Sequence, residues 1–187
     1  MDKIVNYLVH FHKKDNTLTT KVASLLGGII MFLIIFPLLF IWIGSFVRNS
    51  FSFELNKNVE YPLAVLSLIF GLYMLIWTTI SQWRIGKGTP APNAPTQHLI
   101  TSGPYRLCRN PIELGAIFYY LGLGTLYGGI VIGIVCFLLG AVVGSLYHKF
   151  IEEKELELRF GDEYKEYKKV TPFLFPKLKK KDEYDYS

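Results

Sequence analysis

Two arginines and a glutamate stand where a polar, proline-rich segment passes into a long apolar run. Arg106, Arg109 and Glu113 all lie within the stretch 102–115. Charge at a lipid boundary needs a polar partner, so these side chains are candidates for binding a ligand. Proline suits the first position of a helix, and a helix beginning at Pro111 directs its free N–H groups and positive dipole end towards Arg109. The stretch predicts an anion site, and an ordinary juxtamembrane turn with snorkelling arginines is the equal alternative.

A second group of titratable side chains follows the last apolar run. His148 and Glu152 are four residues apart, so a helix places both on one face just beyond the membrane. An imidazole changes charge near neutral pH and can orient a polar headgroup or accept a proton from a thiol or amine. Taken alone, Glu152 and Glu153 are also typical of solvated helix charges.

The composition indicates that the bilayer surrounds much of the chain. Of the 187 residues, 51% are hydrophobic, and they are gathered into long runs. The net charge is +5, and the basic residues stand mostly between or after these runs, which fits anionic headgroups better than nucleic acid. Cys108 and Cys136 make no disulfide framework, so both are expected to be free thiols.

The apolar runs predict an all-α integral membrane protein with about four transmembrane helices. Pro37 should kink the first span, and Trp77 and Trp83 should anchor the second at the membrane interface. The third run is short for crossing about 30 Å of hydrocarbon, so its first turn is expected to be embedded in protein. The last two spans form a hairpin whose glycines allow close packing. The spans are expected at residues 22–47, 61–80, 111–127 and 129–147.

The polar segments divide the chain and orient it. Lysine and arginine are concentrated in the leader, in the loop 84–109 and in the tail, whereas the loop 48–60 has only two such residues. By the positive-inside rule, both termini and the long loop are expected in the cytoplasm, with both groups of charged residues on one side. The expected divisions are a basic leader (1–21), two N-terminal spans (22–81), a catalytic half with a Pro-rich loop, hairpin and C-terminal surface helix (82–176), and a loose tail (177–187).

The surface helix is expected to lie with one apolar face against headgroups or against the long loop. Gly161 should end its first part, and Asp162 can cap the turns that follow. Residues 170–176 form an extended apolar segment that can tuck under the hairpin. The apolar face consists of Leu156, Phe160, Tyr164 and Tyr167.

Several motifs, in this order, resemble the isoprenylcysteine carboxyl methyltransferase family, to which phospholipid N-methyltransferases are related. The resemblance covers about the C-terminal half of the chain, from Gly86 to Pro176, and the first two spans match only as generic membrane helices. The motifs are Gly86–Pro92, His98–Arg106, Arg109-Asn110-Pro111 with Gly115, Glu152-Glu153, and Arg159–Tyr164.

The resemblance implies an integral membrane enzyme that binds S-adenosylmethionine between the loop before the hairpin and the helix after it. On this reading Tyr105 packs on the adenine, Glu152 attracts the ammonium or the sulfonium, and Arg109 or the helix start at Pro111 holds the carboxylate. His148, Arg109 and Glu152 are the expected catalytic residues. The expected cofactor-binding residues are Gln97, His98, Leu99, Ile100, Gly103, Tyr105, Arg109, Asn110, Pro111, Ile112, Glu113, Glu152 and Glu153.

Three positions depart from the family pattern. Asn110 stands where histidine is usual, and Glu113 stands where tyrosine is common. His148 stands where eukaryotic members have an arginine that engages the substrate, which makes a prenylcysteine carboxylate a doubtful acceptor. The methyl acceptor is therefore not decided by the sequence: a lipid, a volatile thiol and a small amine all fit. The methylated atom can be oxygen, sulfur or nitrogen. Methyl transfer from a sulfonium needs no metal, and depends on in-line positioning and exclusion of water.

Two other functions fit parts of the pattern. A membrane reductase of the steroid-reductase type has a similar C-terminal hairpin and would bind a nicotinamide cofactor at the same place. A non-enzymatic transporter subunit or scaffold is the second alternative. Transport usually requires ionisable groups deep within the spans, and residues 22–47 and 61–80 contain none. No nucleic-acid partner is expected, and the oligomeric state is open.

Overall fold

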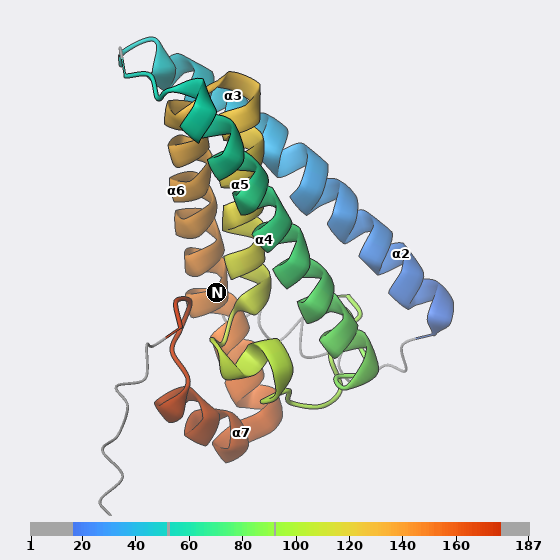
Figure 1. Ribbon diagram of the computed structural model, residues 1–187. Coiled ribbons are helices and arrows are strands. Elements are labelled where there is room, and N and C mark those ends of the chain that lie inside the picture. Colours follow the sequence, from blue (N-terminus) through green and yellow to red (C-terminus); the bar gives the residue numbers. More distant parts are fainter. Residues whose placement is uncertain (1–16, 52, 92, 177–187) are drawn as a thin grey trace, which may run out of the picture.

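The computed structural model describes residues 17–51, 53–91 and 93–176, and within these ranges the chain is helical, with no strand (Figure 1). Residues 1–16 of the predicted leader (1–21) and the whole predicted tail (177–187) lie outside the described residues. The helices are α2 (Leu18–Ile29), the π-helical η1 (Ile30–Ile35), α3 (Phe36–Arg48), α4 (Lys57–Arg84), the 3-10 helix η2 (Gly103–Arg106), α5 (Pro111–Gly128), α6 (Ile130–Tyr147), the π-helical η3 (His148–Glu152) and α7 (Glu153–Val170).

The predicted all-α membrane architecture is confirmed. Three continuous helices are long and apolar enough to cross a membrane, namely Leu18–Arg48, Lys57–Arg84 and the helix that begins at Ile130. The first begins at Leu18, inside the predicted leader, and the second extends beyond the predicted 61–80 at both ends. The reason is that Lys57 and Arg84 continue the helix while their charged ends reach the interface, so hydrophobicity alone places the ends too far inward.

Helix α5 lies between the spans and packs on both α4 and α6 (Figure 1). Glycines of both helices allow backbone contact between α4 and α5: a Cβ on Gly71 of α4 would stand 2.5 Å from the Tyr119 nitrogen, and one on Gly115 of α5 would stand 2.9 Å from the Leu75 nitrogen. Close packing of this kind is how membrane helices associate. Among the described helices α5 is not one of those long and apolar enough to cross a membrane by themselves, and it lies packed against α4 and α6 instead.

The distortion expected at Pro37 takes the form of the π-helical segment η1 directly before it. Proline has no N–H to bond the carbonyl four residues earlier, which belongs to Leu33. Tyr119 Oη donates to this carbonyl at 3.1 Å, and Tyr120 Oη donates to the Phe32 carbonyl at 2.9 Å. Backbone acceptors freed within the bilayer are thereby satisfied by side chains of α5.

Helix α4 begins at the end of the bundle opposite α7 (Figure 1), and a buried glutamate of its first turn closes this end. Glu60 lies in the first turn of α4, and its Oε2 accepts from the Ile130 N–H at 3.0 Å. Lys57 Nζ lies 2.5 Å from Glu60 Oε1. Gly129, at φ 95°, forms the turn of the hairpin and begins α6 there. Residues 57–60 of the predicted loop 48–60 form the first turn of α4 instead.

The C-terminal segment folds back onto the bundle as predicted. Gly161 has non-helical torsion angles (φ 53°, ψ −126°) and breaks α7 into two parts. After α7, the Arg109 N–H donates to the Pro172 carbonyl at 2.9 Å, and the Asn110 N–H donates to the Phe173 carbonyl at 3.2 Å. Leu174 is buried in a cluster with Met74, Cys108, Leu114 and Ile117. The start of α5 is therefore held by the chain that follows α7.

Candidate functional site

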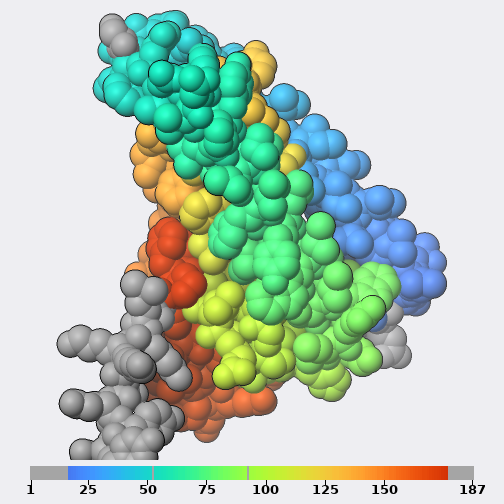
Figure 2. All heavy atoms as spheres, in the orientation of Figure 1, coloured from blue at the N-terminus to red at the C-terminus, as the bar shows by residue number. Residues whose placement is uncertain are grey.

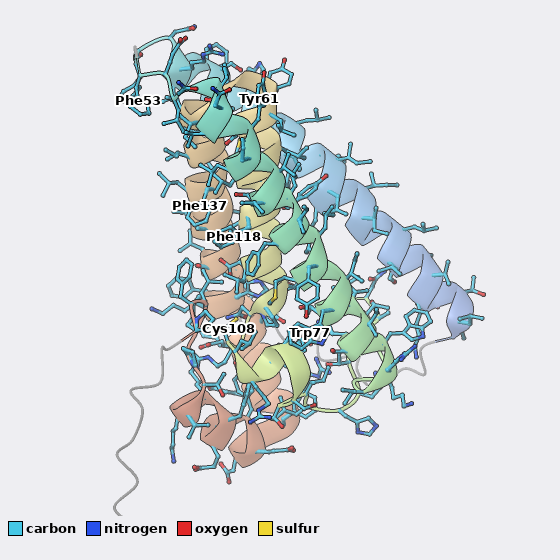
Figure 3. All side chains as sticks on the ribbon, viewed as in Figure 1. Phe53, Tyr61, Trp77, Cys108, Phe118 and Phe137 are labelled. Atoms are coloured by element: carbon cyan, nitrogen blue, oxygen red, sulfur yellow. The ribbon has the colours of Figure 1, made fainter. Side chains whose placement is uncertain are left out.

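The charged residues meet at the end of the hairpin where α5 begins and α6 ends. Because α5 and α6 are antiparallel, the first turn of α5 lies beside the last turn of α6. The 3-10 helix η2 and α7 close this end of the bundle, and Figure 3 shows the side chains of Trp77 and Cys108 at this level. Burial raises the pKa of the Cys108 thiol to about 12. This thiol is therefore protonated at neutral pH and is not a nucleophile.

An imidazole stands between two carboxylates at the centre of the site. His148 Nδ1 is bonded to Glu152 Oε2, and His148 Nε2 lies 3.7 Å from Glu113 Oε2. Ser145 Oγ donates to the other oxygen of Glu113 at 2.7 Å. His148 and Glu113 are buried, whereas the Glu152 side chain is 30% exposed. The two carboxylates stabilise the imidazolium form of His148, and the Glu152 carboxylate is the member that a ligand can reach.

The neighbouring glutamate has a different partner. Glu153 Oε1 lies 3.0 Å from Arg109 Nη2, and Glu153 Oε2 lies 2.6 Å from Lys168 Nζ. Arg109 also donates to the Lys168 carbonyl at 3.3 Å. Glu152 ends the π-helical turn η3 and Glu153 begins α7, and π-helical turns are frequent at functional sites. Two adjacent carboxylates thus serve different contacts, one with His148 and one that fastens α7 to the turn before α5.

Tyr105 of η2 lies at the same end of the bundle and contacts α7. Its carbonyl accepts from Tyr167 Oη on α7 at 2.7 Å. Burial raises the pKa of Tyr105 well above its ordinary value, and the nearby charge of Glu152 raises it further. Tyr105 is therefore a neutral phenol that lies close to Glu152 in a mostly apolar setting. An aromatic ring and a carboxylate are thereby placed together.

The loop before η2 is fastened at both ends. The Gln97 N–H donates to the Gly86 carbonyl at 2.5 Å, and Gln97 Nε2 donates to the Pro95 carbonyl at 3.1 Å. Arg159 on α7 donates to the Thr96 carbonyl and pairs with Glu155 at 2.8 Å. The loop that carries Gln97 is consequently held against α7.

The remaining predicted residues fall into two groups. Asn110 is buried, and its side chain donates to the Phe173 carbonyl at 3.0 Å, so it holds the chain in place. Gly103 has φ 61°, which favours glycine, and a Cβ there would stand 3.6 Å from Trp77 Nε1. The others are distinguished only by exposure: His98 is exposed, Leu99 and Ile112 are half-buried, and Ile100 and Pro111 are buried.

Sequence reasoning missed three residues of this arrangement. Ser145 stands three residues before His148, and this spacing on one helix face was a signal that could have found it. Lys168 and Glu155 had no such signal, because their roles depend on partners that only the fold brings near. The predicted residues do meet in the structure. Glu113, His148 and Glu152 form one contact network, and Arg109 and Glu153 form a second.

Fold and site together define a helical integral membrane protein with a charged site at one end of a central hairpin. Residues 59–163 match the phospholipid methyltransferase family, and the protein belongs to this family. The match covers more than half of the chain and includes the charged residues of the site.

Individual relatives carry two kinds of name. Protein-S-isoprenylcysteine O-methyltransferase of Mus musculus is 28% identical over 159 residues, and the enzyme of Homo sapiens is 29% identical over the same length. Each match covers 68% of this chain and 55% of the relative, so the chain spans about half the length of these curated relatives. Cobalt-zinc-cadmium resistance protein CzcN of Cupriavidus metallidurans is 37% identical over 82 residues, which is 43% of this chain and 36% of that protein. No solved structure matches.

Proposed function

We propose that the protein transfers a methyl group from S-adenosylmethionine to a lipid-like or small membrane-soluble acceptor at the cytosolic face of the membrane. The observation that carries the proposal is that His148 contacts the carboxylates of both Glu113 and Glu152 beside Tyr105. Membership of the phospholipid methyltransferase family supports the reaction class. The cytosolic orientation follows from the positive-inside rule applied to the basic loop 84–109.

The residues at this end suit a cationic donor. S-adenosylmethionine carries a sulfonium and an ammonium group, and Glu152 presents a partly exposed carboxylate beside a half-buried aromatic residue, Tyr105. Glu152 would hold the positive charge, Tyr105 would pack on the adenine, and the segment 97–100 would contact the rest of the cofactor. When bound, the cofactor supplies an electrophilic methyl group on its sulfonium.

The same charges disfavour the membrane reductase. A nicotinamide dinucleotide carries phosphates, which need cations or free N–H groups around them. Arg109 already pairs with Glu153 and Arg159 with Glu155, and two further carboxylates flank His148. The cations of the site therefore already have carboxylate partners, which a negatively charged cofactor would have to displace.

Arg109 acts in this proposal as a positioning residue. Its guanidinium bonds Glu153 and the Lys168 carbonyl, so it holds α7 against the turn that precedes α5. The free N–H groups at the start of α5 then remain for the cofactor's carboxylate. Loss of Arg109 would displace Glu152 indirectly, through movement of α7.

His148 acts on the acceptor. Its ring lies between the carboxylates of Glu113 and Glu152, and these acids repel an acceptor that carries its own carboxylate. A neutral or cationic acceptor such as an amine, a thiol or a lipid headgroup meets no such repulsion. His148 orients this group, and the Glu113 carboxylate, 3.7 Å from Nε2, favours the charged form of the ring.

The decisive experiment uses methyl-labelled S-adenosylmethionine, purified protein and a lipid extract of the native membrane. Label is expected in one class of extracted molecule, which mass spectrometry identifies. Glu152→Gln should abolish this label, and Glu163→Gln, a change at an exposed residue of α7, should leave it unchanged. Binding of NADPH but not of S-adenosylmethionine in calorimetry would contradict the proposal and support the reductase.

A further inference from the structure

A cavity lined by basic residues lies between the start of α2 and the end of α4. Its volume is about 480 Å³. In Figure 2 the beginning of α2 and the segment after α4 adjoin at the lower right of the molecule. The residues that line the cavity are Leu18, Lys21, Trp83, Arg84 and Lys87. None of them belongs to the site described above.

Within the described ranges, the three cations of this cavity have no acidic counterpart. Among the residues that the structure describes, no carboxylate lies within 4.0 Å of the charged groups of Lys21, Arg84 or Lys87. At the same end of the molecule, Arg109 and Arg159 both pair with glutamates. Three like charges around one cavity repel each other, and a polyvalent anion between them relieves this repulsion.

The backbone of Lys87 is held in an unusual conformation. Its φ of 58° is the only positive value for a residue other than glycine in the described ranges. Both neighbours are packed too tightly for a side chain: a Cβ on Gly86 would stand 2.6 Å from Thr96, and one on Gly88 would stand 2.4 Å from Pro95. A left-handed lysine costs conformational energy, and such strain is characteristic of binding sites. Here it accompanies an exposed lysine that lines the cavity.

The position of the cavity indicates where its ligand comes from. It lies where two membrane-crossing helices end, and Trp83 is a residue type that favours the interface. Lys21 Nζ stands 5.8 Å from the centre of the Trp83 ring. Towards the membrane centre, the same two helices expose apolar side chains, including Val22 on α2 and Ile80 on α4. A cationic cavity at the level of the headgroups, with apolar helix surface beside it, fits a phospholipid better than a soluble anion.

We propose that this cavity binds the headgroup phosphate of an anionic phospholipid, such as phosphatidylglycerol, from the leaflet that faces the candidate site. Lys21 and Lys87 contribute point charges, and Arg84 can bond two phosphate oxygens at once. The apolar side chains of α2 and α4 receive the acyl chains. This proposal does not depend on methyl transfer, because the site shares no residue with the proposed cofactor site.

Native mass spectrometry of the detergent-purified full chain tests the proposal. Phosphatidylglycerol is added, with phosphatidylcholine as the zwitterionic comparison, and retained lipid is counted. The triple variant Lys21→Gln/Arg84→Gln/Lys87→Gln is expected to retain phosphatidylglycerol at least tenfold more weakly than the unchanged protein, from roughly a severalfold contribution of each cation. The control Lys149→Gln/Lys154→Gln/Lys169→Gln removes the same charge from exposed positions outside the cavity and should change retention less than about twofold.

The outcomes separate the possible ligands. Equal retention by the triple variant and the control would overturn the proposal, as would equal retention of both lipids by the unchanged protein. Displacement of the lipid by an excess of inorganic phosphate would assign the cavity to a soluble anion and overturn the lipid assignment. Should the triple variant fail to purify as a single species, Arg84→Gln alone decides the question, with a loss of roughly fivefold expected.

Discussion

The two ends of the helical bundle each bury a glutamate near the start of a helix, but they satisfy it differently. At the end away from α7, Glu60 accepts one N–H from Ile130 and pairs with Lys57, so both of its oxygens have a donor. At the other end, Glu113 bonds Ser145 through one oxygen, while its Oε2 is buried without a hydrogen-bond donor and lies 3.7 Å from His148. Both carboxylate oxygens of Glu60 therefore have a hydrogen-bond donor, whereas only one oxygen of Glu113 has one.

This difference separates a structural residue from a functional one. A buried acid whose oxygens are all bonded contributes to stability, because removing it leaves donors unpaired. A buried acid with an unbonded oxygen weakens the fold locally and is retained where the site needs it. On this basis we propose that Glu60 serves the fold and that Glu113, with His148 and Glu152, serves the chemistry. Five substitutions test this proposal.

The largest effect is expected from Glu152→Gln. The change removes the one partly exposed carboxylate of the site and leaves His148 in contact with Glu113 alone. Affinity for S-adenosylmethionine should fall by roughly 10- to 100-fold, the range that loss of a charge-assisted contact gives. Calorimetry in detergent measures it, with Glu157→Gln on α7 as the matched control. Unchanged affinity in Glu152→Gln would remove this residue from the cofactor site.

The next effect is expected from Glu113→Gln. The amide can still accept from Ser145 but no longer stabilises the charge on His148. We expect kcat to fall by about tenfold or more, since the charged form of His148 that orients the acceptor loses one of its two carboxylates, while the KM for S-adenosylmethionine changes little. Ser145→Ala keeps the carboxylate and is the control. A large loss of thermal stability without loss of kcat would instead place Glu113 in the structural class with Glu60.

Glu60→Ala is expected to show the opposite behaviour. It leaves the Ile130 N–H without its acceptor at the hairpin turn. The free energy of unfolding should decrease by about 1–2 kcal/mol, the cost of an unsatisfied buried donor. The melting temperature in detergent measures this loss, and affinity for S-adenosylmethionine, measured below the melting transition, should remain unchanged. Reduced affinity at full stability would mean that the two ends are coupled.

Much of this arrangement could be predicted from the sequence, and the rest depends on contacts between residues far apart in the chain. The start of α5 at Pro111, the break at Gly161 and the shared side of the two charged groups followed from local turn chemistry and charge bias. Glu60 did not, because its acceptor role depends on Ile130, 70 residues away. The pairing of Arg109 with Glu153 was hidden for the same reason, since charge alone does not distinguish a ligand-binding arginine from one that fastens a helix.

The smallest effect is expected in the middle of the bundle, away from both Glu60 and the candidate site. Tyr119→Phe and Tyr120→Phe each remove one hydroxyl that bonds a carbonyl freed by Pro37 and the π-helical segment η1. Each change should reduce the free energy of unfolding by about 1 kcal/mol, the net value of one hydrogen bond. Thermal melting of the single and double variants measures it, and kcat should be unaffected. If either phenylalanine variant reduces turnover while the melting temperature stays constant, then α5 transmits position from α3 to Glu113, and the chemistry depends on the whole length of α5 rather than on its first turn.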